Sequence, residues 1–279
     1  MKFTVFGGAG FIGAHLVRHL RKQGHSVSVP SRDGREIAGD QVGHAIYAIG
    51  VTSDFRNRMH DTIEAHVGTL ERLMHSVAFD SWLTLSSTRV YGCRPGASET
   101  AEDVAIAVAP GADTLYDISK LLGEAITLAN TSATARVARL SNVFGAGQST
   151  DSFLASVLAD VLATGRTALC EAPESAKDYI AVDEVCRLLE AIALHGSARL
   201  YNVASGRNTS HRQLASLLTD AAGARVEFAP GAPVRRFPPI DTTRAAREFG
   251  QAANRLADHV RNTLSSKHLD LTRDPDHEQ

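Results

Sequence analysis

Tyr116 and Lys120 are the two residues whose types and spacing most directly indicate chemistry. Side chains four positions apart share one face of a helix, so the phenol and the ammonium group are expected to lie close together. A tyrosine with its ordinary pKa of about 10 accepts protons poorly at neutral pH, and a fixed cation nearby favours the phenolate. The pair is a candidate acid/base, although the same spacing alone is more typical of an exposed helix face.

The first element that must position this pair is a glycine-rich turn near the N-terminus. The apolar run 2–6 ends in GGAGFIG, residues 7–13, and an amphipathic segment follows. This order indicates strand, turn and helix, in which glycines let the backbone approach a pyrophosphate and the helix N-terminus attracts it. A second apolar run, 26–29, favours dinucleotide binding over an ordinary loop. The candidate cofactor contacts here are Gly7, Gly10, Phe11, Ile12 and Gly13.

The second element is an apolar run that ends in hydroxyl groups, WLTLSST at residues 82–88, followed by VYG at 90–92. Ligands of open parallel sheets bind at the carboxyl ends of the strands, so these hydroxyls are expected to face the cofactor. A Ser-Ser-Thr run alone is most often a capped strand end. Here it stands between the glycine turn and the YxxxK segment.

Together these motifs resemble the extended short-chain dehydrogenase/reductases of the NAD-dependent epimerase/dehydratase family, which modify nucleotide sugars. The resemblance runs almost end to end, and four more segments, 139–148, 177–185, 201–206 and 241–245, are similar to family motifs. Their sequences here are RLSNVFGAGQ, KDYIAVDEV, YNVASG and DTTRA. The resemblance implies an α/β fold, a Rossmann-type doubly wound parallel sheet with a small C-terminal α/β substrate lobe.

The resemblance also implies a catalytic triad of Ser87, Tyr116 and Lys120. Tyr116 would be the general acid/base, Lys120 would lower its pKa and hold the nicotinamide ribose, and Ser87 would bind the reacting oxygen. Ala48 and Ile49, at the end of the third apolar run, are expected to contact the cofactor.

On the substrate side, the expected contacts are Thr88, Asn142, Lys177, Arg235 and Arg236. Thr88 is equally well explained as a strand-end hydroxyl. Lys177 replaces an arginine of the family, so a phosphate there would meet a point charge rather than a planar fork. Arg235 and Arg236 match the place where the family clamps the diphosphate, although adjacent arginines are also typical of a solvated turn.

The cofactor prediction depends on the end of the second strand. NAD enzymes of this type place an acidic residue there, about 20 residues past the glycines. In this chain the position is Ser31, followed by Arg32, and the competing Asp33 comes two residues late. A serine and an arginine can bind a 2′-phosphate, which a carboxylate would repel. We therefore expect NADP(H), with NAD(H) as the alternative.

The resemblance leaves several classes of activity open. Dehydratases of the family carry acidic residues where Thr88 and Arg89 stand, which argues against dehydration. The NADP prediction favours a 4-keto nucleotide-sugar reductase, with a nucleotide-sugar 4-epimerase as the alternative. A non-catalytic cofactor sensor or scaffold is the second alternative, and the retained triad argues against it.

Composition narrows the class of protein. The 279 residues carry a net charge of −2, with both signs interspersed, so no nucleic-acid partner is expected. No apolar run approaches the roughly 20 residues that span a bilayer. The chain begins directly with a strand, which predicts a cytoplasmic protein without a membrane partner. Three scattered cysteines and twelve histidines show no ligand spacing, so no metal site is expected. Like many relatives, the protein is expected to form a homodimer.

The chain divides into three expected regions: an NAD(P)-binding domain at 1–150, a mainly substrate-binding lobe at 151–266 with segments returning to the core, and a disordered tail at 267–279. Only residues 30–43 separate the second and third strands, too few for the helix and strand that the family places there, so this region is expected to be abridged. In the second half, helices are expected at 153–162, 184–194, 211–222, 243–249 and 253–264, and strands at 176–182, 200–203 and 226–228.

Overall fold

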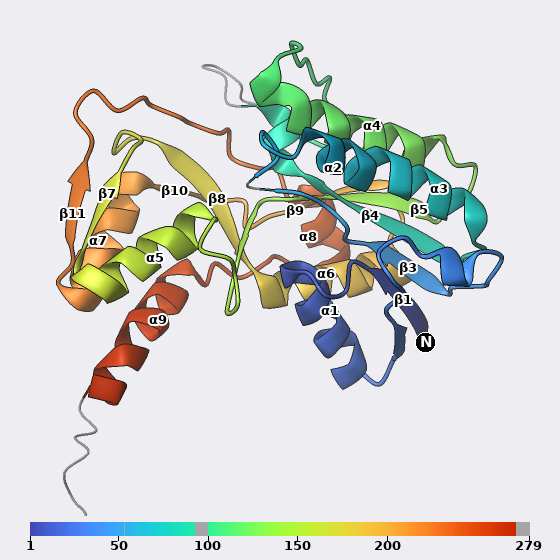
Figure 1. Cartoon of the computed structure of the whole chain (residues 1–279), viewed down its shortest axis with the longest axis horizontal. Coiled ribbons are helices and arrows are strands. Elements are labelled where there is room, and N and C mark those ends of the chain that lie inside the picture. Colours follow the sequence, from blue (N-terminus) through green and yellow to red (C-terminus); the bar gives the residue numbers. More distant parts are fainter. Residues whose placement is uncertain (53, 93–99, 272–279) are drawn as a thin grey trace, which may run out of the picture.

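The computed structural model describes residues 1–52, 54–92 and 100–271, with side chains described to residue 265 (Figure 1). A six-stranded parallel sheet forms the centre of the larger half, in the order β2-β1-β3-β4-β5-β9. This is the predicted Rossmann-type architecture, and the fold prediction is confirmed. The strands are β1 (Lys2–Phe6), β2 (Ser26–Ser28), β3 (His44–Tyr47), β4 (Ser81–Ser87), β5 (Ala135–Leu140) and β9 (Leu200–Val203).

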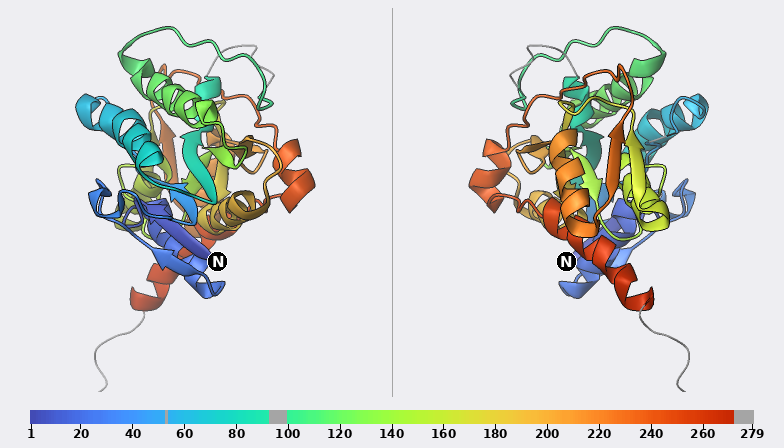
Figure 2. Two further views of the ribbon diagram at one scale, coloured as in Figure 1. Left: turned by 90° about the vertical axis from the view of Figure 1, so that its right-hand side faces the viewer. Right: turned by 90° about the vertical axis from the view of Figure 1, so that its left-hand side faces the viewer.

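Helices cover both faces of this sheet (Figures 1 and 2). On one face lie α1 (Phe11–Lys22), α6 (Val182–His195) and α8 (Thr243–Phe249). On the other face lie α2 (Met59–Ile63), the π-helical turn Glu64–Gly68, α3 (Thr69–Ser76) and α4 (Leu115–Ala129). Because both faces are covered, the central strands are buried on both sides, and β5 is buried along its whole length.

The connection between β2 and β3 is short. Residues 29–43, all of which the structure describes, contain one 3-10 turn, Arg35–Ile37, and no further strand. Strand β2 is therefore an edge of the sheet. The order of the strands reverses at β1, because β2 and β3 pair with opposite sides of it, and ligands of such sheets bind at the carboxyl ends of the strands beside that switch point.

The smaller lobe is built around two short sheets and its own apolar core, on the left in Figure 1. One sheet contains β6 (Asn142–Phe144), β8 (Ala176–Ala181) and β10 (Asn208–Ser210), and the other contains β7 (Arg166–Leu169) and β11 (Arg225–Phe228). Its helices are α5 (Phe153–Thr164), α7 (His211–Ala222) and α9 (Leu256–Leu271). The chain returns from this lobe to the main sheet through α6, β9 and α8.

Two expectations about the C-terminal half need correction. Helix α9 continues to Leu271, so the first five residues of the expected tail are helical, because no glycine or proline interrupts the segment before Pro275. The rest of that tail, 272–279, lies outside the described residues. Strands β6, β7 and β10 were not predicted.

Two of the three cysteines lie within the described residues. Cys186 is buried, Cys170 is exposed, both are free thiols, and Cys93 lies outside the described residues.

Candidate active site

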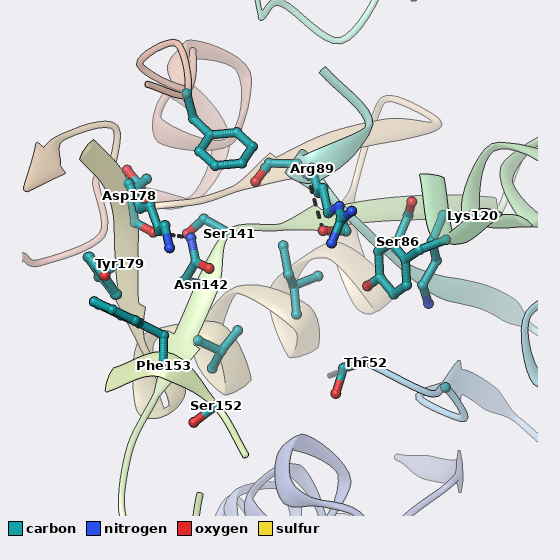
Figure 3. A pocket seen from close by; sticks show the side chains of 18 of the residues that line it. Thr52, Ser86, Arg89, Lys120, Ser141, Asn142, Ser152, Phe153, Asp178 and Tyr179 are labelled. Carbon is teal, nitrogen blue, oxygen red and sulfur yellow. Dashed lines mark hydrogen bonds between the residues drawn. The ribbon is translucent and has the colours of Figure 1, made fainter. Parts of the chain in front are cut away.

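A cavity of about 960 Å³ lies between the carboxyl ends of the main sheet and the smaller lobe. Its lining comes from segments distant in the sequence, among them the glycine turn, the end of β4 and the start of α4. Figure 3 shows Ser86, Arg89 and Lys120 on one side of the cavity and Asn142, Phe153 and Tyr179 on the other.

The glycine turn is shaped to accept a dinucleotide. Gly7 has φ +80°, and a Cβ there would lie 2.9 Å from the backbone carbonyl carbon of Ala48. A Cβ on Gly13 would lie 2.2 Å from the carbonyl oxygen of Gly7, so the first turn of α1 fits against the loop only without a side chain. The unpaired N–H groups at this end of α1 then face the cavity. Gly10, Phe11, Ile12 and Gly13, together with Ala48 and Ile49, line it.

The three predicted catalytic residues lie together in this cavity. Ser87 ends β4, and Tyr116 and Lys120 lie on the first turns of α4, with Ser87 hydrogen-bonded to the tyrosine side chain. The Lys120 Nζ donates to the carbonyl oxygen of Leu85 (3.0 Å) and lies 5.9 Å from the centre of the Tyr116 ring. The structure therefore brings the two side chains of the YxxxK motif onto one helix face.

The electrostatics of the pair differ from the expectation. Burial raises the pKa of the Tyr116 phenol, while the hydrogen bond with Ser87 and the charge of Arg89 oppose that rise. The groups that lower the tyrosine pKa are thus Ser87 and Arg89, whereas Lys120 was the group expected to do so. Burial lowers the pKa of Lys120 itself to about 8, against the opposing charge of Glu124.

His66 is part of the site, and the sequence analysis did not identify it. It lies in the π-helical turn, a geometry that is frequent at functional sites. Its Nε2 accepts from the Val51 N–H (3.2 Å), its Nδ1 lies 2.8 Å from Ser119 Oγ, and its ring meets the Tyr116 ring edge-on, with 5.3 Å between centroids. Burial, reinforced by Lys120, lowers the His66 pKa to about 3. His66 is thus a neutral support beneath Tyr116. The only sequence signal was a histidine within a short apolar stretch.

A buried ion pair fixes the strand beneath the triad. Arg139 of β5 makes two hydrogen bonds to the Glu124 carboxylate of α4, at 2.6 and 2.9 Å. The same carboxylate accepts from Ser86 Oγ at 2.5 Å. Charge-assisted contacts of this kind lock β4, β5 and α4 in one register.

Some of the residues expected to contact the substrate line the cavity, and others do not. Thr88 is buried at the cavity wall, and Asn142 lines the cavity while its Nδ2 donates to the Asp178 carbonyl (2.8 Å). Lys177 also lines it, but its Nζ lies 3.2 Å from a carboxylate oxygen of Glu171 and 4.4 Å from the centre of the Phe153 ring. The Lys177 ammonium group, which was expected to bind a phosphate, is therefore already paired with the Glu171 carboxylate.

The two adjacent arginines separate. Arg235 lines the cavity, with Nε 3.8 Å from a Glu171 oxygen. Arg236 is outside the cavity lining, and its Nε donates to the Glu174 carbonyl (3.2 Å). Consecutive side chains of an extended segment point to opposite sides, and Arg236 forms a β-bridge with Ala176. In the structure, only Arg235 of the two arginines expected at the substrate lines the cavity, and their substrate contacts stay a prediction.

The end of the second strand carries more negative charge than expected. The Ser31 hydroxyl donates to Glu36 (2.5 Å) and to Asp33 (3.0 Å), and the Ser31 N–H also donates to Glu36 (2.5 Å). Arg32 is exposed, and neither Ser31 nor Arg32 lines the cavity. Glu36 was missed because the 3-10 turn that brings it back onto Ser31 has no sequence periodicity.

Two other features bear on partners. Within the described residues, none of the helices is both long and apolar enough to cross a membrane. The same residues contain no group of three or more His, Cys, Asp or Glu side chains placed to hold a metal ion.

Residues 3–204 match the family model described as the NAD dependent epimerase/dehydratase family. The chain belongs to this family. A dTDP-glucose 4,6-dehydratase from Streptomyces griseus is 29% identical over 313 residues, covering 95% of this chain and 93% of the relative.

Solved structures share the fold at lower sequence identity. The structure of MoeE5 with UDP-glucose and NAD superposes with a TM-score of 0.78 at 22% identity, covering 98% of this chain and 100% of the other. RMD from Pseudomonas aeruginosa, complexed with NADPH, gives 0.78 at 21% identity, covering 95% and 99%. A UDP-glucuronic acid 4-epimerase from Bacillus cereus gives 0.80 at 16% identity, covering 96% and 100%. Members of this fold thus bind either NAD or NADPH.

Proposed function

We propose that this protein is a nucleotide-sugar 4-epimerase that oxidises and then reduces one sugar carbon with a nicotinamide dinucleotide. The observation that carries the proposal is the meeting of Ser87, Tyr116 and Lys120 with the glycine turn in one cavity. The curated relative acts on a dTDP-sugar, and two of the superposed proteins bind UDP-sugars, which supports a nucleotide sugar as the substrate class.

The protein's own residues divide the reaction between them. Ser87 donates a hydrogen bond to the O4 oxygen of the sugar, and Tyr116 takes the O4 proton as the hydride leaves C4. The nicotinamide, when bound, supplies the hydride acceptor and returns the hydride. Lys120, with a pKa of about 8, is mostly protonated at neutral pH, so it can hold the ribose hydroxyls and favour the phenolate. Return of the hydride to the other face of C4 inverts that carbon with no net change of cofactor.

The cofactor that these residues favour is NAD. A 2′-phosphate at Ser31 would meet two carboxylates, Asp33 and Glu36, whereas the hydroxyls of an unphosphorylated ribose could donate to them. Our expectation of NADP(H) depended on Ser31 being free, and in the structure its hydroxyl is occupied. An NAD that stays bound through both half-reactions suits an epimerase.

An NADPH-dependent 4-keto nucleotide-sugar reductase is the second candidate. Arg32 is exposed beside Ser31 and could pair with a 2′-phosphate. The short connection between β2 and β3 leaves that end open, which favours exchange of the cofactor at each turnover. Dehydration has less support, since Thr88 and Arg89 provide no carboxylic acid at the end of β4.

One experiment distinguishes these activities. The purified protein and NAD are incubated with one nucleotide sugar at a time: UDP-glucose, UDP-glucuronic acid or dTDP-glucose. The products are identified by nuclear magnetic resonance. Inversion at C4 without net NADH supports the epimerase. Stoichiometric loss of NADPH with a 4-keto nucleotide sugar would instead establish the reductase. Bound dinucleotide with neither reaction would favour a cofactor sensor and contradict both.

A second copy of the chain is the partner we propose. Four of the seven large hydrophobic side chains exposed in the described structure, Met59, Ile63, Ile118 and Leu122, lie on α2 and α4. These two helices pack side by side on one face of the sheet (Figures 1 and 2). Light scattering should give a dimer, and Leu122→Glu should shift it toward a monomer by placing charge in the apolar patch. A wild-type monomer would rule the pairing out.

A further inference from the structure

Arg89 places a guanidinium group beside the reacting end of the cavity, where it acts on the Tyr116 phenol through its charge and still has N–H donors for a substrate. It follows Ser87 by two residues, in the 3-10 turn Thr88–Tyr91, and it lines the cavity. Its guanidinium carbon lies 5.4 Å from the centre of the Tyr116 ring. A substrate group that binds Arg89 is therefore close to C4, the sugar carbon whose hydroxyl proton Tyr116 takes.

The guanidinium group is held in a fixed orientation. Its Nη2 donates to the Asp113 carbonyl (3.0 Å), its Nε lies 3.0 Å from Asp117 Oδ1, and the group also packs 5.1 Å from the centre of the buried Phe55 ring. An arginine has five N–H donors in a planar fork, so these contacts leave donors for a ligand. The side chain remains 36% exposed, and it lines the cavity.

The surrounding acids cancel this charge only in part. The Asp113 side chain is 80% exposed and pairs with Arg56, so solvent screens it. Asp117 is largely buried, and burial raises its pKa, which makes its carboxylate easier to protonate beside an incoming anion. An anionic group at Arg89 therefore meets a favourable potential.

Building on the proposed function, we infer that Arg89 selects a nucleotide-linked hexuronic acid by pairing with its C6 carboxylate. A planar guanidinium fork matches a planar carboxylate with two parallel hydrogen bonds. In a hexuronic acid this carboxylate is attached to C5, next to the reacting C4. The diphosphate is a poorer fit for this position, because Arg235 lines the cavity from the lobe instead.

The inference makes Arg89 a specificity-determining residue, and its test is a ratio of affinities. With NAD present, calorimetry measures Kd for UDP-glucuronic acid and for UDP-glucose, and the same acid and neutral pair is repeated with dTDP as the nucleotide. Loss of a charge-assisted fork usually weakens binding by about 10- to 100-fold. We expect the wild type to favour the acid by that factor, and Arg89→Gln to bring the ratio to within about threefold.

Two matched variants show whether the fork or merely the charge matters. Arg89→Lys keeps the charge without the fork and should recover only part of the preference. Arg56→Gln removes a neighbouring cation that packs on the same Phe55 ring, 4.5 Å from its centre, and should keep most of the preference. Unchanged thermal melting and NAD affinity would show that each variant is folded.

The outcomes separate this inference from the proposed function. Binding and C4 inversion of both sugars without preference, or an Arg89→Gln variant that keeps the preference, would overturn the inference and leave the epimerase standing. An equal loss in Arg89→Gln and Arg56→Gln would also overturn it, because that pattern indicates a diffuse field. If no sugar of the panel binds, both proposals fail.

Discussion

The two sides of the cavity satisfy their buried polar groups to different degrees. On the side of the main sheet, Lys120, His66 and Ser87 all have hydrogen-bond partners within the protein. On the side of the smaller lobe, Tyr179 lines the cavity, and its buried hydroxyl has no hydrogen-bond partner among the described residues. Unmet buried groups of this kind cost about 1–3 kcal/mol each. The comparison teaches that the side with Ser87, Tyr116 and Lys120 is organised in advance, whereas the lobe side keeps a polar group, the Tyr179 hydroxyl, that a ligand can satisfy.

The largest effect on activity is expected from replacing Tyr116. Tyr116→Phe removes the proton acceptor and should lower kcat by about 10²- to 10⁴-fold, the usual contribution of general acid–base catalysis. Cofactor affinity should change little, because the glycine turn is untouched. Steady-state kinetics together with a dinucleotide titration measure both quantities. Retained turnover would remove Tyr116 from the mechanism.

Acid should lower the folding stability of the protein through protonation of His66, which packs against Tyr116. Its folded pKa of about 3 is below the ordinary value of 6.5, so the unfolded chain binds a proton first as the pH falls. The stability that neutral His66 contributes is complete above pH 6.5 and is lost progressively toward pH 3. Between pH 7 and pH 5 the wild type should lose about 2 kcal/mol more than His66→Asn.

Urea unfolding at the two pH values measures this difference. Other buried histidines are common to both proteins, so their contributions cancel in the comparison. Equal losses in the wild type and the variant would show that His66 is not the acid-sensitive group.

The lobe side is tested by treating the two adjacent arginines separately. Arg235→Ala should raise KM for the nucleotide sugar about tenfold, as expected for a lost contact with a charged ligand. Arg236→Ala is the matched control and should change KM less than twofold, because its side chain is outside the cavity lining. Equal effects of the two variants on KM would contradict the placement of these side chains.

The smallest effect is expected at the adenosine end of the cofactor. Glu36→Gln removes one carboxylate from the Ser31 hydroxyl and should raise the ratio of NADP to NAD affinity about fivefold, or about 1 kcal/mol. Arg32→Ala should lower the same ratio. Fluorescence titrations with the reduced cofactors give it directly. An unchanged ratio in both variants would show that specificity is set elsewhere.

The sequence predicted the parts of the molecule that local patterns determine. The glycine turn, the YxxxK helix and helices α7 and α8 follow from periodicity and residue type, and the structure has them at the predicted positions. Other features depend on contacts between distant residues. Glu36 reaches Ser31 through a 3-10 turn, and Glu171 pairs with Lys177 across a loop of the lobe. No spacing rule encodes such pairings. The sequence analysis therefore missed the negative charge beside Ser31 and the carboxylate that pairs with Lys177.

The short connection after β2 also affects how the protein avoids self-association through its sheet. Without a further strand, β2 is the exposed edge, and open backbone groups on an edge strand can recruit another chain. Strand β2 has only three residues, Ser26–Ser28, and both serines are exposed. An edge this short and polar offers a second chain little to pair with. Abridging the fold therefore leaves the sheet protected against edge-to-edge aggregation.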